Sequence, residues 1–147
     1  MHRTVTLALG AMSLANGAVM LVAPELWARV TPGVPAPFNA HMVRDVGIAF
    51  MVAGGGLLWM ARDISARPAA IAGASFLAMH AGLHVVEGLL GMHGGVASPV
   101  APLLRDFPGV HLPAALAVWV ATRAPSTPSA ADADAGVAAT PRGRMSA

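Results

Sequence analysis

The sequence predicts an all-α fold, namely an integral membrane four-helix bundle with a short interfacial helix after the first span and a disordered C-terminal tail. Composition is the first observation behind this prediction. The chain of 147 residues is 56% hydrophobic and only 11% charged, with a mean hydropathy of +0.64. A soluble domain carries about 25% charged residues, so a chain with so few charges is suited to lipid. The second observation is a succession of four apolar runs separated by prolines, glycines and charges.

The first predicted span covers about residues 4–23, a run without a charge that is long enough to cross a bilayer. A cleaved signal peptide is the alternative interpretation, but the run is long for a signal and lacks a good cleavage site. Pro24 ends the run. Residues 24–30 then predict the short interfacial helix, because Pro suits a first helical turn and Trp27 and Arg29 suit the headgroup level.

Three further spans follow from the remaining apolar runs. The second covers about residues 41–61 and the third about residues 68–91. The fourth, about residues 110–122, is short for a full crossing, so we expect it to begin earlier or to lie in a thinned region of the bilayer. Residues 1–123 thus form one transmembrane unit. Residues 124–147 consist mostly of Ala, Ser, Thr, Pro, Asp and Gly without an apolar period, which predicts a disordered tail.

The distribution of arginine predicts the orientation of the chain. Four spans place both termini and the loop between the second and third spans on the same side. That side carries most of the basic residues, namely Arg3, Arg62, Arg67, Arg123, Arg142 and Arg144. Cytoplasmic loops are rich in basic residues, so we expect a bacterial inner (cytoplasmic) membrane protein with both termini inside. The arginines are scattered and do not form a nucleic-acid-binding face, so the predicted surroundings are the lipid bilayer.

The third predicted span carries an unusual set of ionisable residues. His80, His84 and Glu87 stand at positions i, i+4 and i+7, which places them within an arc of roughly 60° on one helix face. Ionisable groups inside a membrane span are costly and usually face a functional interior. This face is therefore the first candidate for a site.

Polar residues of the other spans are predicted to converge on the same leaflet. The expected topology places these polar residues in the leaflet that faces the loops at residues 24–40 and 92–109. These residues are Asn16 in the first span, His41, Arg44 and Asp45 in the second, and His111 in the fourth. Convergence from four helices predicts one polar site.

Several chemistries fit this set of residues. Imidazole and carboxylate ligands suit a transition metal such as Cu, Zn or Fe. The candidate ligands are His80, His84, Glu87, His41, Asp45 and His111, with Asn16 and Arg44 as supporting polar residues. Haem b held by two histidines is a second interpretation, and proton or quinone handling is a third. A fourth is a structural network in which the polar groups satisfy one another.

A resemblance to a known family adds to these expectations. The run Asn39-Ala-His-Met-Val-Arg-Asp-Val-Gly47 opens the second span. Together with the size and the four spans, it resembles small four-helix bacterial membrane proteins of the DoxX-like kind, over about residues 4–123. The resemblance implies a membrane subunit linked to an oxidoreductase, and hence a membrane redox partner or a quinone. It carries over no site residues.

The functional prediction is binding of a metal or haem, or support of a redox or quinone partner, at the polar site. Two alternatives come from other classes. One is a non-catalytic structural or accessory membrane subunit, and the other is a small proton-coupled carrier that acts as a homo-oligomer. The chain has no Cys, and its histidines do not form the HExxH zinc-protease motif. No catalytic residues are identified, which favours a non-enzymatic role.

Overall fold

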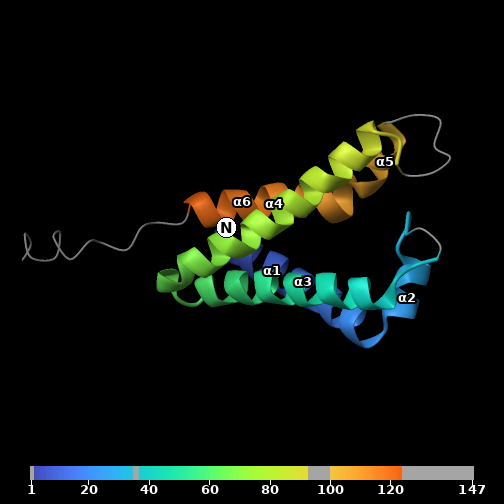
Figure 1. The fold of residues 1–147 in the computed structure, drawn as a ribbon. Coiled ribbons are helices and arrows are strands. Elements are labelled where there is room, and N and C mark those ends of the chain that lie inside the picture. The colour runs from blue at the N-terminus through green and yellow to red at the C-terminus, as the bar shows by residue number, and fades with distance from the viewer. Residues whose placement is uncertain (1, 35–36, 93–99, 124–147) are drawn as a thin grey trace, which may run out of the picture.

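A computed structural model describes residues 2–34, 37–92 and 100–123, and every regular element in these ranges is helical (Figure 1). The predicted tail at residues 124–147 lies outside them. In chain order the elements are α1 (His2–Val22), α2 (Pro24–Val30), α3 (Ala40–Met60), η1 (Ile64–Ala66), α4 (Arg67–Leu89), α5 (Val100–Asp106), η2 (Phe107–His111) and α6 (Leu112–Arg123). The all-α prediction is confirmed for the described residues.

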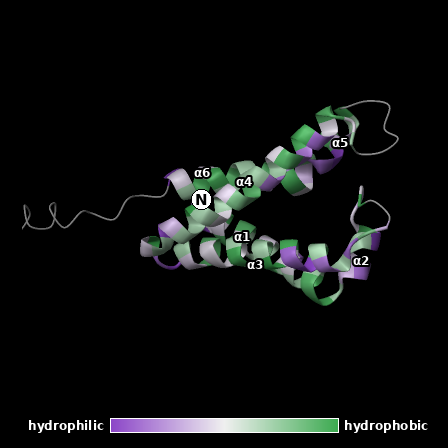
Figure 2. Ribbon diagram, viewed as in Figure 1, coloured by the Kyte–Doolittle hydropathy of each residue, from purple (hydrophilic) through white to green (hydrophobic). Residues whose placement is uncertain are grey.

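Three of the described helical segments are long and apolar enough to cross a membrane. They are α1, α3 and the segment Ile64–Leu89, which joins η1 to α4. They lie where the sequence predicts the first three spans. Figure 2 shows apolar residues along these helices and hydrophilic residues concentrated toward their ends.

The helical path of the fourth apolar run begins earlier than residue 110, which agrees with one of the two expectations from the sequence. A helix confined to α6 has 12 residues, which is short of the 20 or so that a crossing needs. However, α5, η2 and α6 follow one another without a break, so the helical path begins at Val100. Residues 103–107 belong to this path.

A π-turn interrupts the regular α-helical path at η2. The backbone N–H of Leu112 donates to the carbonyl of Phe107, five residues earlier, in place of the usual four. Pro108 lies within this turn and has no N–H to donate, which disfavours a regular α-helix there. The turn separates Asp106 on its N-terminal side from His111 at its end.

The helices α1 and α3 form an antiparallel pair held close by glycines. Gly10 and Gly17 are seven residues apart on α1, and so are Gly47 and Gly54 on α3. Gly10 faces Gly54 and Gly17 faces Gly47, so a Cβ added at Gly54 would lie only 2.7 Å from the Gly10 carbonyl oxygen. Only small residues allow backbones to approach so closely.

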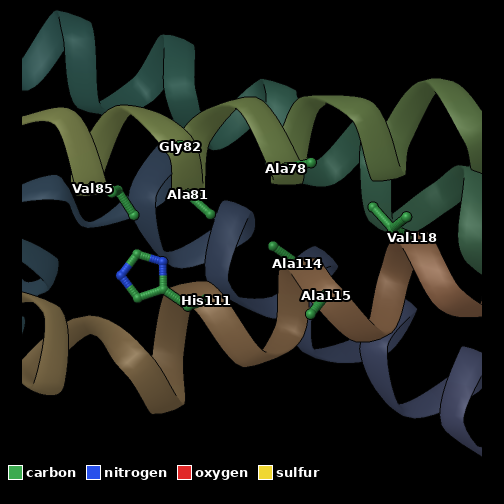
Figure 3. Close-up of a pocket in the computed structure, with 8 residues that line it drawn as sticks. All are labelled: Ala78, Ala81, Gly82, Val85, His111, Ala114, Ala115 and Val118. Atoms are coloured by element: carbon green, nitrogen blue, oxygen red, sulfur yellow. The ribbon is translucent and has the colours of Figure 1, made fainter.

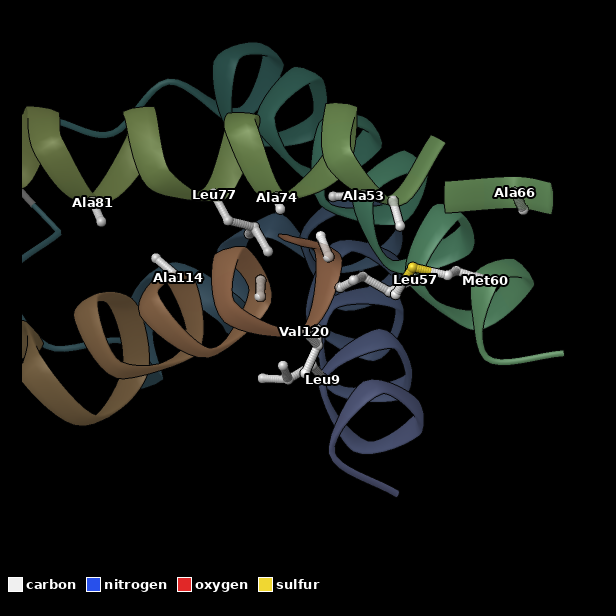
Figure 4. Packing of buried hydrophobic residues seen from close by; sticks show 13 residues of the cluster. Leu9, Ala53, Leu57, Met60, Ala66, Ala74, Leu77, Ala81, Ala114 and Val120 are labelled. Carbon is white, nitrogen blue, oxygen red and sulfur yellow. The ribbon is translucent and has the colours of Figure 1, made fainter. Parts of the chain in front are cut away.

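The second helix pair, α4 and α6, packs on the first. α3 contacts α4, α4 contacts α6, and α6 contacts α1. The shared core is built largely from alanine, with a few larger side chains (Figure 4). Its members are Leu9, Ala53, Leu57, Met60, Ala66, Ala70, Ala74, Leu77, Ala81, Ala114, Ala117, Val120 and Ala121. Toward the end that carries α2 and α5, the two pairs diverge (Figure 1).

Arginine side chains donate hydrogen bonds to carbonyls at the C-terminal ends of α1, α3 and α6. Arg44 of α3 donates to the Leu21 carbonyl at the end of α1, and Arg3 of α1 donates to the Ala61 carbonyl just after α3. Arg67 donates to two carbonyls in the last turn of α6. The last carbonyls of a helix have no partner within the helix, and a cation is favourable at this end. Each of these arginines thus links the start of its own helix to the end of a neighbouring helix.

The glycine contact predicts opposite effects for two adjacent substitutions. Gly54→Ala forces α1 and α3 apart, because its Cβ meets backbone atoms of Gly10 and Leu14, and should destabilise the protein by about 1–3 kcal/mol. Gly55→Ala meets nothing within 4 Å and should stabilise it by up to about 1 kcal/mol through helix propensity. Thermal unfolding in detergent measures both. Equal effects of the two substitutions would contradict the close approach.

Candidate functional site

The strongest polar cluster joins α4 to α5 around the carboxylate of Asp106. Its Oδ2 lies 2.9 Å from Nδ1 of His84, while Arg105 donates through Nε to Oδ1 at 2.6 Å and through Nη2 to Oδ2 at 3.0 Å. The Asp106 side chain is only 8% exposed. A carboxylate can only accept hydrogen bonds, so the proton of this contact lies on Nδ1 of His84. Asp106 therefore holds two donors from two helical elements.

The end of α5 positions both the carboxylate of Asp106 and the guanidinium of Arg105. Asp106 is the last residue of α5, directly before the π-turn. Arg105 precedes it and extends to the loop after α2, where its guanidinium lies against Gly33. Gly33 has φ +83°, and a Cβ at this position would overlap the guanidinium, so glycine is required both for the backbone and for the contact. Arg105 thus connects the two diverging helix pairs.

The electrostatics of the cluster favour the charged forms of Asp106 and Arg105. Burial alone raises the pKa of Asp106, but hydrogen bonds from Arg105 and His84, together with their charges, outweigh burial and lower it to about 2. The hydrogen bond to Asp106 in turn raises the pKa of Arg105. Such charge-assisted, two-point contacts between Arg and a carboxylate are among the stronger hydrogen bonds in proteins.

His80 extends the cluster toward the interior of the molecule. Its ring contacts the His84 ring edge-on, with centroids 4.8 Å apart. On its other side His80 stacks on Phe76 at 5.9 Å and meets the edge of Phe50 at 5.4 Å. A row of two imidazoles and one carboxylate therefore runs from aromatic surroundings to α5. Glu87 lies half-buried one turn beyond His84 on α4.

The polar residues that open α3 lie apart from this row. His41 and Asp45 form an exposed pair on one turn, with Nε2 3.4 Å from Oδ2 and side chains 86% and 59% exposed. Arg44 is used to bind the end of α1. Asn39, a residue type that favours the N-cap position of a helix, caps α3 by accepting hydrogen bonds from the N–H groups of His41 and Met42.

Asn16 and His111 occupy two further places. The side-chain oxygen of Asn16 accepts a hydrogen bond of 3.0 Å from the indole of Trp27, so it fastens α2 to α1. His111 lies at the end of η2 and faces α4 near Ala81 and Val85 (Figure 3). The structure thus brings His80 and His84 together with Asp106, and places Asn16, His41 with Asp45, and His111 in three other environments.

The predicted metal centre finds no support in this arrangement. Within residues 2–34, 37–92 and 100–123, no group of three or more His, Asp or Glu side chains is arranged to hold a metal ion. The metal and haem interpretations stay predictions.

Sequence reasoning did not select Arg105 and Asp106. Two adjacent charges between apolar residues are nevertheless a signal of a polar contact. The expected topology also placed this loop on the same side as His84. Combining these two points would have made Asp106 a candidate partner of His84.

Comparison with known proteins identifies no relative: no family model, no curated protein and no solved structure matches the chain. The resemblance to DoxX-like proteins stays a prediction.

The lowered pKa of Asp106 predicts a pH-dependent contribution to stability. Because the carboxylate titrates at about 2 in the folded chain and near 3.8 in the unfolded chain, its contribution is fully present above pH 4. It should be lost as the pH falls from about 4 toward 2, and it amounts to roughly 2 kcal/mol. The difference in unfolding temperature between wild type and Asp106→Asn should therefore shrink over this range.

Asp45→Asn provides the matched control, since Asp45 contacts His41 in an exposed pair on α3. Exposed pairs contribute little to stability, so this variant should stay close to wild type. Similar, pH-independent losses for Asp106→Asn and Asp45→Asn would contradict the assignment of Asp106 as a buried, paired carboxylate.

Proposed function

We propose that this small helical protein is an integral membrane protein with four spans. Three described helices have the length and composition to cross a bilayer, and large apolar side chains are exposed along them. Examples are Val52, Met79 and Leu83, which are more than half exposed. The 5 residues of η2 and the 12 of α6 together reach the lower end of the crossing range, about 17–25 residues. In this arrangement α5 lies at the membrane boundary.

We further propose that the protein acts as a non-catalytic accessory membrane subunit, that is, a membrane protein that supports a partner subunit. The observation that carries this proposal is Asp106, whose carboxylate is occupied by Arg105 and His84. Polar groups that satisfy one another in this way fasten helices together. The cluster therefore serves to fix α5 on α4 and to hold the boundary segment in a defined position. A partner subunit could recognise that fixed segment, in keeping with the resemblance to oxidoreductase-linked membrane proteins.

Proton handling is a second candidate function. The contiguous row of His80, His84 and Asp106 supports it, because imidazoles near carboxylates form proton relays in membrane proteins. A chain of this size would need an oligomer to build a complete pathway.

Proton flux separates the two candidates. The purified protein is reconstituted into liposomes that contain a pH-sensitive dye, and a potassium gradient with valinomycin drives proton entry. As an accessory subunit, the protein should give the same rate as empty liposomes. A rate well above empty liposomes that falls in the His84→Phe variant would overturn the accessory proposal and support proton handling.

Orientation is tested with fusions. We propose a bacterial inner-membrane location with both termini in the cytoplasm, on the basis of the arginine distribution. Green fluorescent protein fused after residue 123 should therefore fluoresce. Alkaline phosphatase fused at Gly33 should be active, because that loop is then outside. A dark first fusion together with an inactive second fusion would show the reverse orientation.

A further inference from the structure

The end of the bundle at which α3 and α6 finish carries an excess of positive charge. Among the described residues, four arginines and only one carboxylate, that of Asp63, lie there. The arginines are Arg3 at the start of α1, Arg62 just after α3, Arg67 at the start of α4 and Arg123 at the end of α6. They are scattered in the sequence, and the helix arrangement brings them to one end. Figure 2 shows hydrophilic residues where α3 ends, α4 begins and α6 ends.

Hydrogen bonds group these arginines in two pairs of the same construction. Arg3 donates through Nε to the carbonyl of the residue before Arg62, at 3.1 Å. Arg67 donates through Nη2 to the carbonyl of the residue before Arg123, at 2.8 Å. In each pair, one guanidinium is held by the end of a neighbouring helix and the other follows directly in the chain. Positive charge is thus concentrated at the ends of α3 and α6.

Tryptophan side chains lie at the same end. Trp59, in the last turn of α3, is 58% exposed. Trp119 of α6 stacks on His2 with ring centroids 4.2 Å apart, so the start of α1 adjoins the end of α6. Tryptophan is enriched at the headgroup level of membranes. The arginines therefore lie where lipid phosphates are expected.

The contacts within the chain leave most of the N–H donors of these arginines available. A guanidinium carries five N–H donors. Arg3 and Arg62 each donate one hydrogen bond to a backbone carbonyl, and Arg67 donates two. In the described part of the chain, none of the four arginines forms an ion pair with a carboxylate. Oδ1 of Asp63 instead accepts a hydrogen bond of 2.9 Å from the backbone N–H of Ser65.

The arginines described at the opposite end of the bundle have acidic neighbours. Arg105 is bound by Asp106. Arg44 directly precedes Asp45, and the short helix of Arg29 has an acidic residue in its first turn. Within the described residues, unbalanced positive charge is therefore confined to the end at which α3 and α6 finish.

We propose that the arginine surface formed by Arg3, Arg62, Arg67 and Arg123 binds the phosphate groups of anionic phospholipids. A planar guanidinium matches phosphate because it donates two parallel hydrogen bonds to it. Basic pockets between membrane helices bind anionic headgroups in this way. Their carbonyl contacts hold Arg3 and Arg67 in place, so a phosphate meets donors that are already positioned. A phospholipid without net charge also carries an ammonium group, which the arginines repel.

The proposal rests on the membrane location proposed above, because the partner is a lipid. It depends neither on the orientation of the chain nor on whether the Asp106 cluster is structural or handles protons. Membrane fractionation of cells tests the location separately. Protein that fractionates with membranes and shows no lipid preference overturns the arginine surface alone, whereas protein in the soluble fraction overturns both.

Native mass spectrometry tests the lipid preference. The purified protein in detergent is mixed with equal amounts of phosphatidylglycerol and phosphatidylcholine that carry the same acyl chains. Wild type should retain phosphatidylglycerol at least about fivefold more often, which is the factor expected for one basic residue near an anionic surface. Equal retention of the two lipids would overturn the proposal.

Arg62 and Arg29 provide a matched pair of variants. Both are exposed and donate to the carbonyl of the residue four positions earlier, but they lie at opposite ends of the bundle. Arg62→Gln should lower the preference at least about twofold, and Arg29→Gln should leave it unchanged. Equal reductions in the two variants would show that net charge alone sets the preference, which contradicts a localised surface.

A double variant tests whether the lipid binds the folded chain at this surface. Arg62→Gln combined with Arg123→Gln keeps Arg3 and Arg67, which also hold helix ends. Phosphatidylglycerol should raise the unfolding temperature of wild type more than phosphatidylcholine does, because a ligand of the folded state stabilises it. This difference should largely vanish in the double variant. A difference that persists unchanged would overturn the assignment to these arginines.

Discussion

The close approach of α1 and α3 is the constraint on which the other helices depend. Glycines facing each other in two places bring the two backbones into contact. α3 then offers its other side to α4, where Gly73 lies against the Ala53 backbone. α6 completes the arrangement by packing on α4 and α1. Because the contacts are made by glycine and alanine, packing of complementary backbone surfaces stabilises the fold. Such packing is typical of helices in lipid, in keeping with the membrane location that we propose.

Beyond the end of this packing, polar interactions hold the helices in position. The alanine core extends along α4 only as far as Ala81, and beyond it the two helix pairs diverge (Figure 1). At this end His84 holds Asp106, and Arg105 reaches back to Gly33. Hydrogen bonds to charged groups contribute about 1.5–3 kcal/mol each, and they are strengthened where water is scarce. The cluster therefore replaces apolar packing as the means of positioning α5.

Much of the fold could be predicted from the sequence, because it depends on local patterns. The apolar runs predicted three long helices, and Pro24 marked a helix start that the structure contains. The continuous helical path through α5 to α6 was not predicted, since Pro108 normally ends an α-helix, whereas here a π-turn accommodates it. The sequence signal alone could not distinguish these two outcomes.

The candidate site could be predicted only in part. The face shared by His80 and His84 followed from helical spacing, and the structure places these rings in contact. The partner of His84 comes from Asp106, 22 residues later in the chain, and such a pairing depends on how helices pack. The same dependence explains why Asn16 binds Trp27 of another helix, whereas His41 pairs with Asp45 one turn away on its own helix. Local spacing identified polar residues, whereas tertiary packing decided which of them meet.

A double-mutant cycle between His84 and Asp106 tests the central claim most directly. The free energy of unfolding in detergent is measured for wild type, His84→Gln, Asp106→Asn and the double variant at neutral pH. If the two side chains fasten α5 to α4 as their contact of 2.9 Å indicates, their coupling energy should be at least about 1 kcal/mol. Additive effects of the two substitutions, with a coupling energy near zero, would contradict the account.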